Sequence, residues 1–131
     1  MSKILIDTSI VIDFLRQKDK SKTMLFYFAD NKYALYSSII THTESYAGKS
    51  VWERQDAMEA LETLFSNIKI LPLTEDISKK AGEISVRYSI DIIDAVIASI
   101  ALYHKLAFAT LNVKDFKNIE GLKLTSSKWV L

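Results

Sequence analysis

The sequence predicts an α/β fold with a central parallel sheet of four to five short strands flanked by helices. Short aliphatic runs that suit buried parallel strands alternate along the chain with longer segments of helical periodicity. Only three Gly and one Pro interrupt the 131 residues, and no repeat or low-complexity segment is visible. Strands that alternate with helices imply a parallel sheet covered on both faces, so ligands are expected at the carboxyl ends of its strands.

The composition predicts one globular domain over residues 1–131. Hydrophobic residues make up 49% of the chain and charged residues 25%, which is an ordinary balance for a domain that folds without disulfides. The absence of Cys excludes a cysteine nucleophile and a thiolate zinc site, and it fits a reducing cytoplasm. No signal peptide or membrane-spanning stretch is evident, so a cytoplasmic location is expected. The net charge of +1 gives no electrostatic indication of a nucleic-acid partner.

The first strand–helix unit is predicted at the start of the chain. Residues 3–6 form a short aliphatic run, and residues 10–16 continue with helical periodicity. Asp7, Thr8 and Ser9 lie between them as candidate helix N-caps.

A second unit is predicted from residue 20 onward. Residues 20–30 carry apolar side chains at helical spacing, and residues 33–36 are a strand candidate. One of the serines at 37–38 can cap a helix that runs to about Tyr46, with Gly48 as its C-terminal stop.

The middle of the chain predicts a further helix, strand and helix. Residues 51–65 form an amphipathic helix, and Pro72 closes a strand over 68–71. Thr74 then begins a helix that continues to Tyr88.

The last part predicts the longest apolar helix and the end of the sheet. Asp91 begins a helix that runs to about Lys105. A strand over 107–110, a helical turn over 113–116 and a last short strand over 122–125 follow.

Two aspartates are placed where a site is expected. Asp7 follows the first strand directly, although it has the alternative role of helix N-cap, which Thr8 or Ser9 can also fill. Asp94 lies in the first turn of a helix that is apolar on nearly every face. A carboxylate there is costly unless it is hydrogen-bonded, paired or metal-bound. The alternative for Asp94 is a capping box with Asp91 as the N-cap.

Two further acids are ambiguous from spacing alone. Glu44 follows Thr41 in a capping-box pattern, or it lies about two turns inside a helix, where most Glu side chains are solvated. Asp115 follows the strand over 107–110, and either Asn112 or Asp115 can reach the same sheet edge.

Several carboxylates at one sheet edge require a compensating charge. Without a cation between them they repel one another, and the pKa of each is raised. Ligand sets made only of oxygen select Mg²⁺ or Mn²⁺ over zinc. Such ions activate water and stabilise the oxygens of a phosphodiester, so no His, Cys or Lys is required for catalysis.

Four segments, in order, resemble the PIN-domain ribonucleases, particularly the small VapC-type toxins of prokaryotic toxin-antitoxin pairs. The segments are ILIDTSIVIDFL at 4–15, SSIITHTES at 37–45, DAVIASIAL at 94–102 and TLNVKDF at 110–116. Their order and spacing make the resemblance far more specific than any single acid.

The resemblance implies the roles of particular residues. It makes Asp7, Glu44 and Asp94 the three principal metal-binding and catalytic acids and Asp115 the fourth. It also implies that hydroxyl and amide side chains line or complete the acidic pocket, and the candidates are Thr8, Thr110 and Asn112. Some relatives have Asp where this chain has Asn112, so either the site is less anionic here or Asp115 supplies the charge.

The expected function is a Mg²⁺- or Mn²⁺-dependent endoribonuclease that cleaves RNA. The resemblance adds a small antitoxin protein as partner and a homodimer as the usual assembly. The main rival is a PIN-like module that binds RNA or a partner without cutting it, its acids acting only as caps. A receiver-type phosphoacceptor lacks its Asp after the strand over 68–71, and a phosphatase with Asp7 as nucleophile would need Asp where Ser9 stands.

Overall fold

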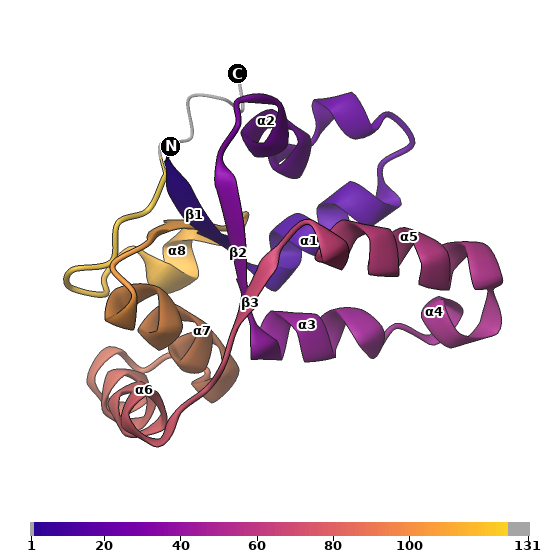
Figure 1. Cartoon of the computed structure of the whole chain (residues 1–131). Helices are drawn as coiled ribbons and strands as arrows, with labels where there is room; N and C mark the ends of the chain where they lie inside the picture. Colours follow the sequence, from indigo (N-terminus) through magenta and orange to yellow (C-terminus); the bar gives the residue numbers. More distant parts are fainter. Residues whose placement is uncertain (1, 126–131) are drawn as a thin grey trace.

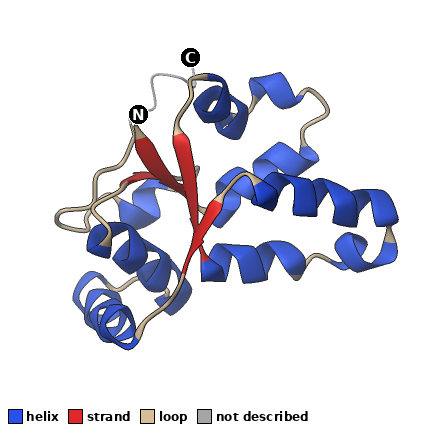
Figure 2. Ribbon diagram, in the orientation of Figure 1, coloured by secondary structure: helices blue, strands red, loops and turns tan. Residues whose placement is uncertain are grey.

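The computed structural model describes residues 2–125 and has a parallel sheet at its centre (Figure 2). The four strands are β1 (Lys3–Ile6), β2 (Ala34–Ser38), β3 (Lys69–Leu71) and β4 (Ala107–Ala109). Their order in the sheet is β3-β2-β1-β4, and every neighbouring pair is parallel. The predicted α/β class is therefore confirmed, with the smaller of the two expected numbers of strands.

Helices cover both faces of this sheet (Figure 1). The eight helices among the described residues are α1 (Thr8–Arg16), α2 (Met24–Asp30), α3 (Ile39–Tyr46), α4 (Lys49–Glu53), α5 (Gln55–Ser66), α6 (Glu75–Tyr88), α7 (Ile92–Tyr103) and α8 (Val113–Phe116). Side chains of β1 alternate between two cores, because successive residues of a strand point to opposite faces. Leu5 packs with α6, α7 and α8, whereas Ile4 and Ile6 pack with α1, α2 and α5.

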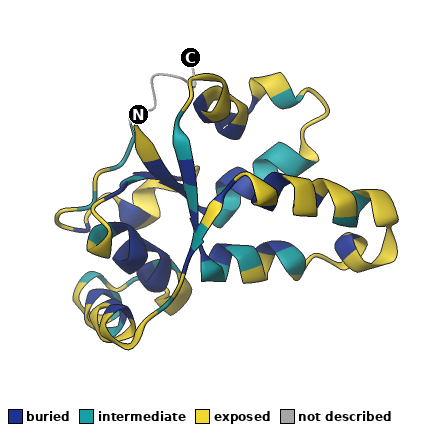
Figure 3. Cartoon of the chain, in the orientation of Figure 1, coloured by how far each residue is buried: buried dark blue, intermediate teal, exposed yellow. Residues whose placement is uncertain are grey.

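The helix α7 is the most deeply buried helix of the structure (Figure 3). Its buried residues run without interruption from Ala95 to Ala101, because the sheet lies on one side and α6 on another. The first turn of α7 is exposed: Ile92 and Ile93 lie at the surface and Asp94 is half-buried. The fold therefore carries Asp94 on a fixed element and presents it at the boundary between core and solvent.

Three helix starts use the predicted caps. The side chains of Ser38, Thr74 and Asp91 each accept a hydrogen bond from a backbone N–H in the first turn of the helix that follows. Each cap satisfies one of the donors that a helix leaves without a partner at its N-terminus. The beginnings of α3, α6 and α7 are thus fixed without any contribution from Glu44 or Asp94.

Two predicted helices are each divided in the structure. The helix expected over 20–30 is a single 3₁₀ turn at 20–22 followed by α2, because Thr23 is extended and caps α2. The helix expected over 51–65 is broken at Arg54, which is extended between α4 and α5. The break lets Val51 of α4 and Leu61 of α5 both reach the same core.

Helix α3 ends at Tyr46, as predicted, but the role predicted for Gly48 and the last predicted strand are wrong. Gly48 does not stop α3 in a left-handed conformation; its φ is −67° and it is the N-cap of α4. The strand expected over 122–125 is reduced to one bridge between Phe108 and Leu124. Only two backbone hydrogen bonds tie this segment to β4, from Phe108 N–H to the Lys123 carbonyl and from Thr125 N–H to the Phe108 carbonyl. Among the described residues, no helix is both long and apolar enough to cross a membrane.

Candidate active site

Asp7 lies at the carboxyl end of β1 and is buried. Its backbone N–H donates to the carbonyl of Ala109, which ties it to the end of β4. Asp7 occupies the N-cap position of α1, but its side chain makes no capping hydrogen bond. Instead Oδ2 accepts hydrogen bonds from the hydroxyls of Ser9 (2.9 Å) and Thr110 (2.7 Å). The carboxylate is therefore held in place by two neutral donors while its other oxygen, Oδ1, has no partner among the described residues.

The same two hydroxyls also fix the loop after β4. The backbone N–H of Leu111 donates to Ser9 Oγ (3.0 Å), and that of Asn112 donates to Thr110 Oγ1 (3.0 Å). Ser9 and Thr110 thus connect the ends of β1 and β4, which are neighbours in space and about a hundred residues apart in sequence. This arrangement fixes the position of Asn112 relative to Asp7.

Glu44 is brought to the site by α3. The helix begins where β2 ends and packs against α1 and α7 (Figure 1). Oε1 of Glu44 accepts a hydrogen bond of 2.6 Å from the hydroxyl of Thr8. That hydroxyl also lies 3.0 Å from Thr41 Oγ1, and Thr41 Oγ1 accepts a hydrogen bond of 3.2 Å from the Ser38 hydroxyl. The chain of hydroxyls orients Glu44, and the capping-box arrangement with Thr41 does not form because Ser38 caps α3.

Asp94 projects from the first turn of α7. Asp91 alone caps this helix, through a hydrogen bond of 3.0 Å from the Ile93 N–H, and the Asp94 carboxylate accepts no hydrogen bond from residues 2–125. Burial, followed by the negative charges of Asp7, Asp91, Asp115 and Glu44, raises the pKa of Asp94 to about 6. The carboxylate thus carries charge that the described protein atoms do not compensate.

Asp7, Glu44 and Asp94 line one pocket of about 570 Å³. Its wall also includes Thr8 and Asn112, whereas Thr110 is buried beside Asp7 and Asp115 is exposed outside the lining. The principal acids that lie far apart in sequence are therefore gathered at one edge of the sheet. Asp115 is close enough to raise the pKa of Asp94 but does not border the pocket.

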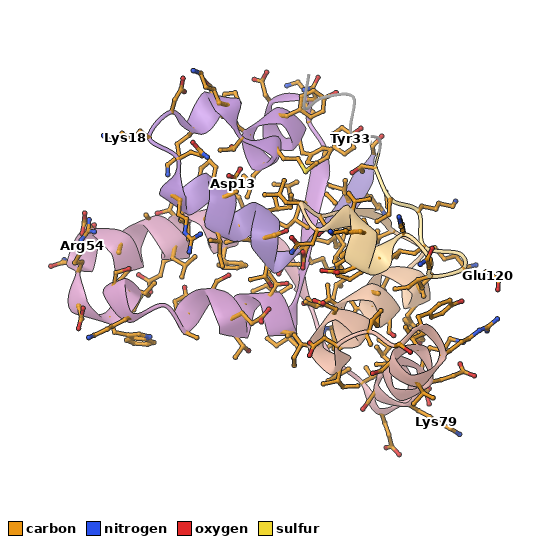
Figure 4. All side chains as sticks on the ribbon, turned by 180° about the vertical axis from the view of Figure 1, so that it is seen from behind. Asp13, Lys18, Tyr33, Arg54, Lys79 and Glu120 are labelled. Carbon is orange, nitrogen blue, oxygen red and sulfur yellow. The ribbon has the colours of Figure 1, made fainter. Side chains whose placement is uncertain are left out.

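Three residues that line the pocket were not predicted to do so from the sequence. Ser9 was named as a candidate helix cap and as the position where a phosphatase would need Asp, and Asp13 and Arg16 are second-turn and last-turn residues of α1. Asp13 is labelled on α1 in Figure 4. Its carboxylate accepts a hydrogen bond of 3.2 Å from the Gln17 side chain. Positions 9, 13 and 16 share a face of a helix with 3.6 residues per turn, and that spacing was the available signal.

The donors of this pocket fit a hard divalent cation. Carboxylate oxygens are the ligands that Mg²⁺ and Mn²⁺ prefer. The pKa of Asp94 is raised first by burial and then by neighbouring negative charges, which a cation would offset. Over the described part of the chain, no group of three acidic or His side chains is placed so that it could hold a metal ion by itself. The residues therefore fit an ion such as Mg²⁺, which is usually bound by one or two carboxylates and keeps several waters.

The raised pKa of Asp94 predicts a pH-dependent stability of the metal-free protein. An Asp in the unfolded chain titrates near 3.9, so between about pH 4 and pH 6 the folded state binds more protons than the unfolded state. The stability contributed by protonated Asp94 is therefore lost as the pH rises through about 6. The measurement is urea unfolding of both proteins with chelator. The free energy of unfolding of wild type minus that of Asp94→Asn should decrease from about pH 4.5 to about pH 7.5. A difference that does not change with pH would contradict this assignment.

The sequence matches known families over nearly its whole length. A family model described as the PIN domain matches residues 4–122. Ribonuclease VapC19 of Mycobacterium tuberculosis is 32% identical over 124 residues, which cover 91% of this chain and 96% of the relative. Ribonuclease VapC1 of Rickettsia felis is 33% identical over 130 residues, covering 92% of this chain and 93% of the relative.

Solved structures show the same fold. The DNA-bound VapBC structure from Salmonella typhimurium has a TM-score of 0.79 at 21% identity and covers 95% of this chain and 98% of that chain. A toxin-antitoxin complex from Klebsiella pneumoniae has a TM-score of 0.76 at 24% identity and covers 94% and 96%, respectively. At these identities the likeness concerns the arrangement of helices and strands.

Proposed function

The chain belongs to the PIN domain family and, within it, to the VapC ribonucleases, and from that membership we propose that it hydrolyses RNA phosphodiesters with a bound Mg²⁺ or Mn²⁺. The observation that carries the proposal is the convergence of Asp7, Glu44 and Asp94 on one pocket, although 37 and 50 residues separate them successively along the chain. Membership supplies the reaction class, and the pocket supplies the residues proposed to perform it.

We propose that the three acids hold the metal, directly or through water, with the carboxylate oxygens that the protein leaves free. Asp7 keeps Oδ1 and Glu44 keeps Oε2 without a partner in the described residues, because Ser9, Thr110 and Thr8 engage the other oxygen of each carboxylate. Both carboxylate oxygens of Asp94 are without a hydrogen-bond partner in residues 2–125. A bound Mg²⁺ or Mn²⁺ supplies a water of lowered pKa and polarises the phosphoryl oxygen. The hydroxyl donors keep the carboxylates oriented, which preserves the site geometry before substrate arrives.

The fourth position is proposed to be shared. Asn112 borders the pocket and offers a neutral amide, whereas Asp115 adds negative charge from just outside it. We propose that Asp115 acts through water and that Asn112 contacts water or the phosphate.

The rival function, a PIN-like module that binds without cutting, is less well supported. In that reading the acids serve as helix caps. Ser38 and Asp91 already cap α3 and α7, and the side chain of Asp7 caps nothing. Three carboxylates that share one pocket and cap no helix are better explained by metal binding.

The test is incubation of the purified chain with structured and single-stranded RNA in Mg²⁺, in Mn²⁺ and in chelator. We expect internal cleavage with either metal, none with chelator, and recovery after metal is restored. The control for a contaminating nuclease is Asp94→Asn, purified in parallel. Cleavage that persists in chelator, or equally in Asp94→Asn, would contradict the proposal.

We further propose that the protein is the toxin of a toxin-antitoxin pair, works as a homodimer and is inhibited by a small antitoxin protein. The support is the VapC relationship together with exposed apolar side chains. Leu111 lines the pocket, and Ile92, Ile93 and Val113 are neighbours in sequence of the pocket residues Asp94 and Asn112. Of the aromatic residues in α2 and α4, Phe26, Tyr27 and Trp52 are also exposed, whereas Phe28 belongs to the core.

Growth of a bacterial host provides a prediction for the toxin role. Expression of the wild-type chain alone should arrest growth, and the matched Asp7→Asn variant at equal protein level should not, because only the wild type cleaves RNA. The measurement is colony count after induction, with western blotting to equalise expression. Equal growth of both strains would count against the toxin role while leaving the cleavage assay to decide the enzymatic one.

A further inference from the structure

A lysine stands at or just before the start of every strand of the sheet. Lys3 and Lys69 begin β1 and β3, and Lys32 and Lys105 lie two residues before β2 and β4. Because all four strands are parallel, their starts lie at one edge of the sheet and their ends at the other. The molecule is therefore polarised, with the candidate catalytic acids at the carboxyl edge and lysines at the amino edge.

A second pocket, of about 540 Å³, opens at this basic edge. Its basic lining consists of Lys3, Lys69, His104 and Lys105, and the rest is Tyr36, Leu71 and Leu106. No acidic residue lines it, and it shares no lining residue with the pocket that holds Asp7. It is similar in volume to the acidic pocket and opposite to it in charge.

Strand register explains why these side chains meet. Tyr36 is the partner of both Leu5 on β1 and Lys69 on β3. Lys3 is two residues before Leu5, so Lys3, Tyr36 and Lys69 point to the same face of the sheet. Further along that face α7 covers the strands, and α7 ends at Tyr103 beside His104 and Lys105. The hollow thus lies where the helical cover ends and the sheet face continues.

Ordinary structural duties account for only part of this basic cluster. His104 and Lys105 follow the C-terminus of α7, where positive charge stabilises the helix dipole. Lys3 and Lys69 begin strands and have no such duty. Within residues 2–125, none of the three lysines of the pocket lies within 4 Å of a carboxylate, since all the ion pairs there involve other residues. Like charges gathered around a hollow without internal acids favour an external anion.

We propose that this amino-edge pocket binds phosphate groups of RNA, an inference that rests on the proposed ribonuclease function for the identity of the polyanion. The acidic pocket repels a nucleic-acid backbone, and Arg16 is the one cation among its described lining residues. With a net charge of only +1, the chain has no general attraction for RNA. The lysines of the amino edge supply compact positive charges that bind phosphate, and they retain a long RNA while its cleavage site reaches the carboxyl edge.

The test compares two double variants with equal loss of charge. The test variant is Lys3→Gln with Lys69→Gln, and the control is Lys18→Gln with Lys79→Gln, whose side chains lie at the periphery in Figure 4 and line no pocket described here. Fluorescence anisotropy of a labelled single-stranded RNA, with chelator to prevent cleavage, gives the affinity from about 50 to about 200 mM salt.

We expect the test variant to bind RNA roughly tenfold to thirtyfold more weakly than wild type at about 0.1 M salt. The slope of log K against log salt concentration should become shallower by about 1.4, which is about 0.7 for each of two lost phosphate contacts. The control should remain close to wild type. In metal, the test variant should show a raised KM for long RNA with little change in kcat.

Equal RNA binding by both double variants would overturn the inference, and metal-dependent cleavage by wild type in the same preparation would show that the proposed function stands regardless. If the test variant lost RNA binding while wild type did not cleave RNA in metal, the basic site would be supported and the proposed ribonuclease function would be rejected. Unchanged RNA binding with weakened capture of an acidic protein partner would also overturn the assignment to RNA.

Discussion

Replacing Asp7 with Asn is expected to reduce metal-dependent RNA cleavage by about a thousandfold or more, while the fold is retained. Asp7 makes more side-chain hydrogen bonds than Glu44 or Asp94: its Oδ2 is bound by Ser9 and Thr110, and its backbone is tied to the end of β4. An amide oxygen can still accept both hydroxyl donors, and the amide NH₂ then faces the pocket where Oδ1 stood. The metal would lose a charged ligand. Several kcal/mol of transition-state stabilisation by a metal correspond to about three orders of magnitude in rate.

The matched control for this variant is Asp91→Asn. Asp91 is an acid near the same pocket, but it caps α7 and does not line the pocket, and Asn is as good an N-cap as Asp. We expect Asp91→Asn to keep activity within a few-fold of wild type. The measurements are single-turnover cleavage rates at saturating metal, with circular dichroism to verify folding. Similar rates for wild type and Asp7→Asn, or similar losses in both variants, would show that general negative charge near the pocket, rather than Asp7, supports cleavage.

The sequence was sufficient for the sheet but not for several boundaries. The run over residues 3–6 and its counterparts are short, aliphatic and bounded by polar residues, and such local signals do not depend on the rest of the fold. The break at Arg54 interrupts a continuous helical pattern, and Val51 and Leu61 on its two sides pack in the same core, a tertiary arrangement that the local pattern does not contain. The segment over 122–125 has strand-like composition, but pairing depends on a partner, and β4 offers it only one bridge.

The candidate site was predictable to different depths. Asp7 and Asp94 can be identified from the local sequence alone. Asp7 directly follows a strand, and Asp94 lies in a helix so apolar that a carboxylate without a partner would be costly there. Glu44 is exposed in the second turn of its helix, and only the packing of α3 against α1 and α7 brings it to the pocket. The role of Ser9 depends on β4 lying beside β1, which joins residues 9 and 111 through a hydrogen bond. Local spacing does not contain that pairing.

A stability difference of roughly 2.7 kcal/mol between metal-bound and metal-free protein is expected when Mg²⁺ or Mn²⁺ is at about a hundredfold its dissociation constant. The acids of the site come together only in the folded chain, so the metal binds the native state and not the unfolded one. Asp94→Asn should lose most of this increment, because it removes the carboxylate whose oxygens have no partner in the described protein and whose pKa is raised by burial and by its acidic neighbours.

The same substitution should act in the opposite direction when metal is absent. Around pH 7.5 the Asp94 carboxylate is ionised although burial and its neighbours disfavour its charge, so Asp94→Asn should make the metal-free protein as stable as wild type or more stable. Helix α7 keeps its cap, because Asp91 provides it. The measurement is urea unfolding of both proteins with saturating metal and with chelator at constant ionic strength, so that screening is not mistaken for binding. If metal raised the free energy of unfolding equally in both proteins, the ion would bind elsewhere. If metal raised it in neither protein, the acids would not bind metal. Asp94→Asn should therefore lower the free energy of unfolding when metal is bound and leave it equal or raise it when metal is absent. Such opposite effects are expected of a carboxylate that binds an ion and destabilises the metal-free fold.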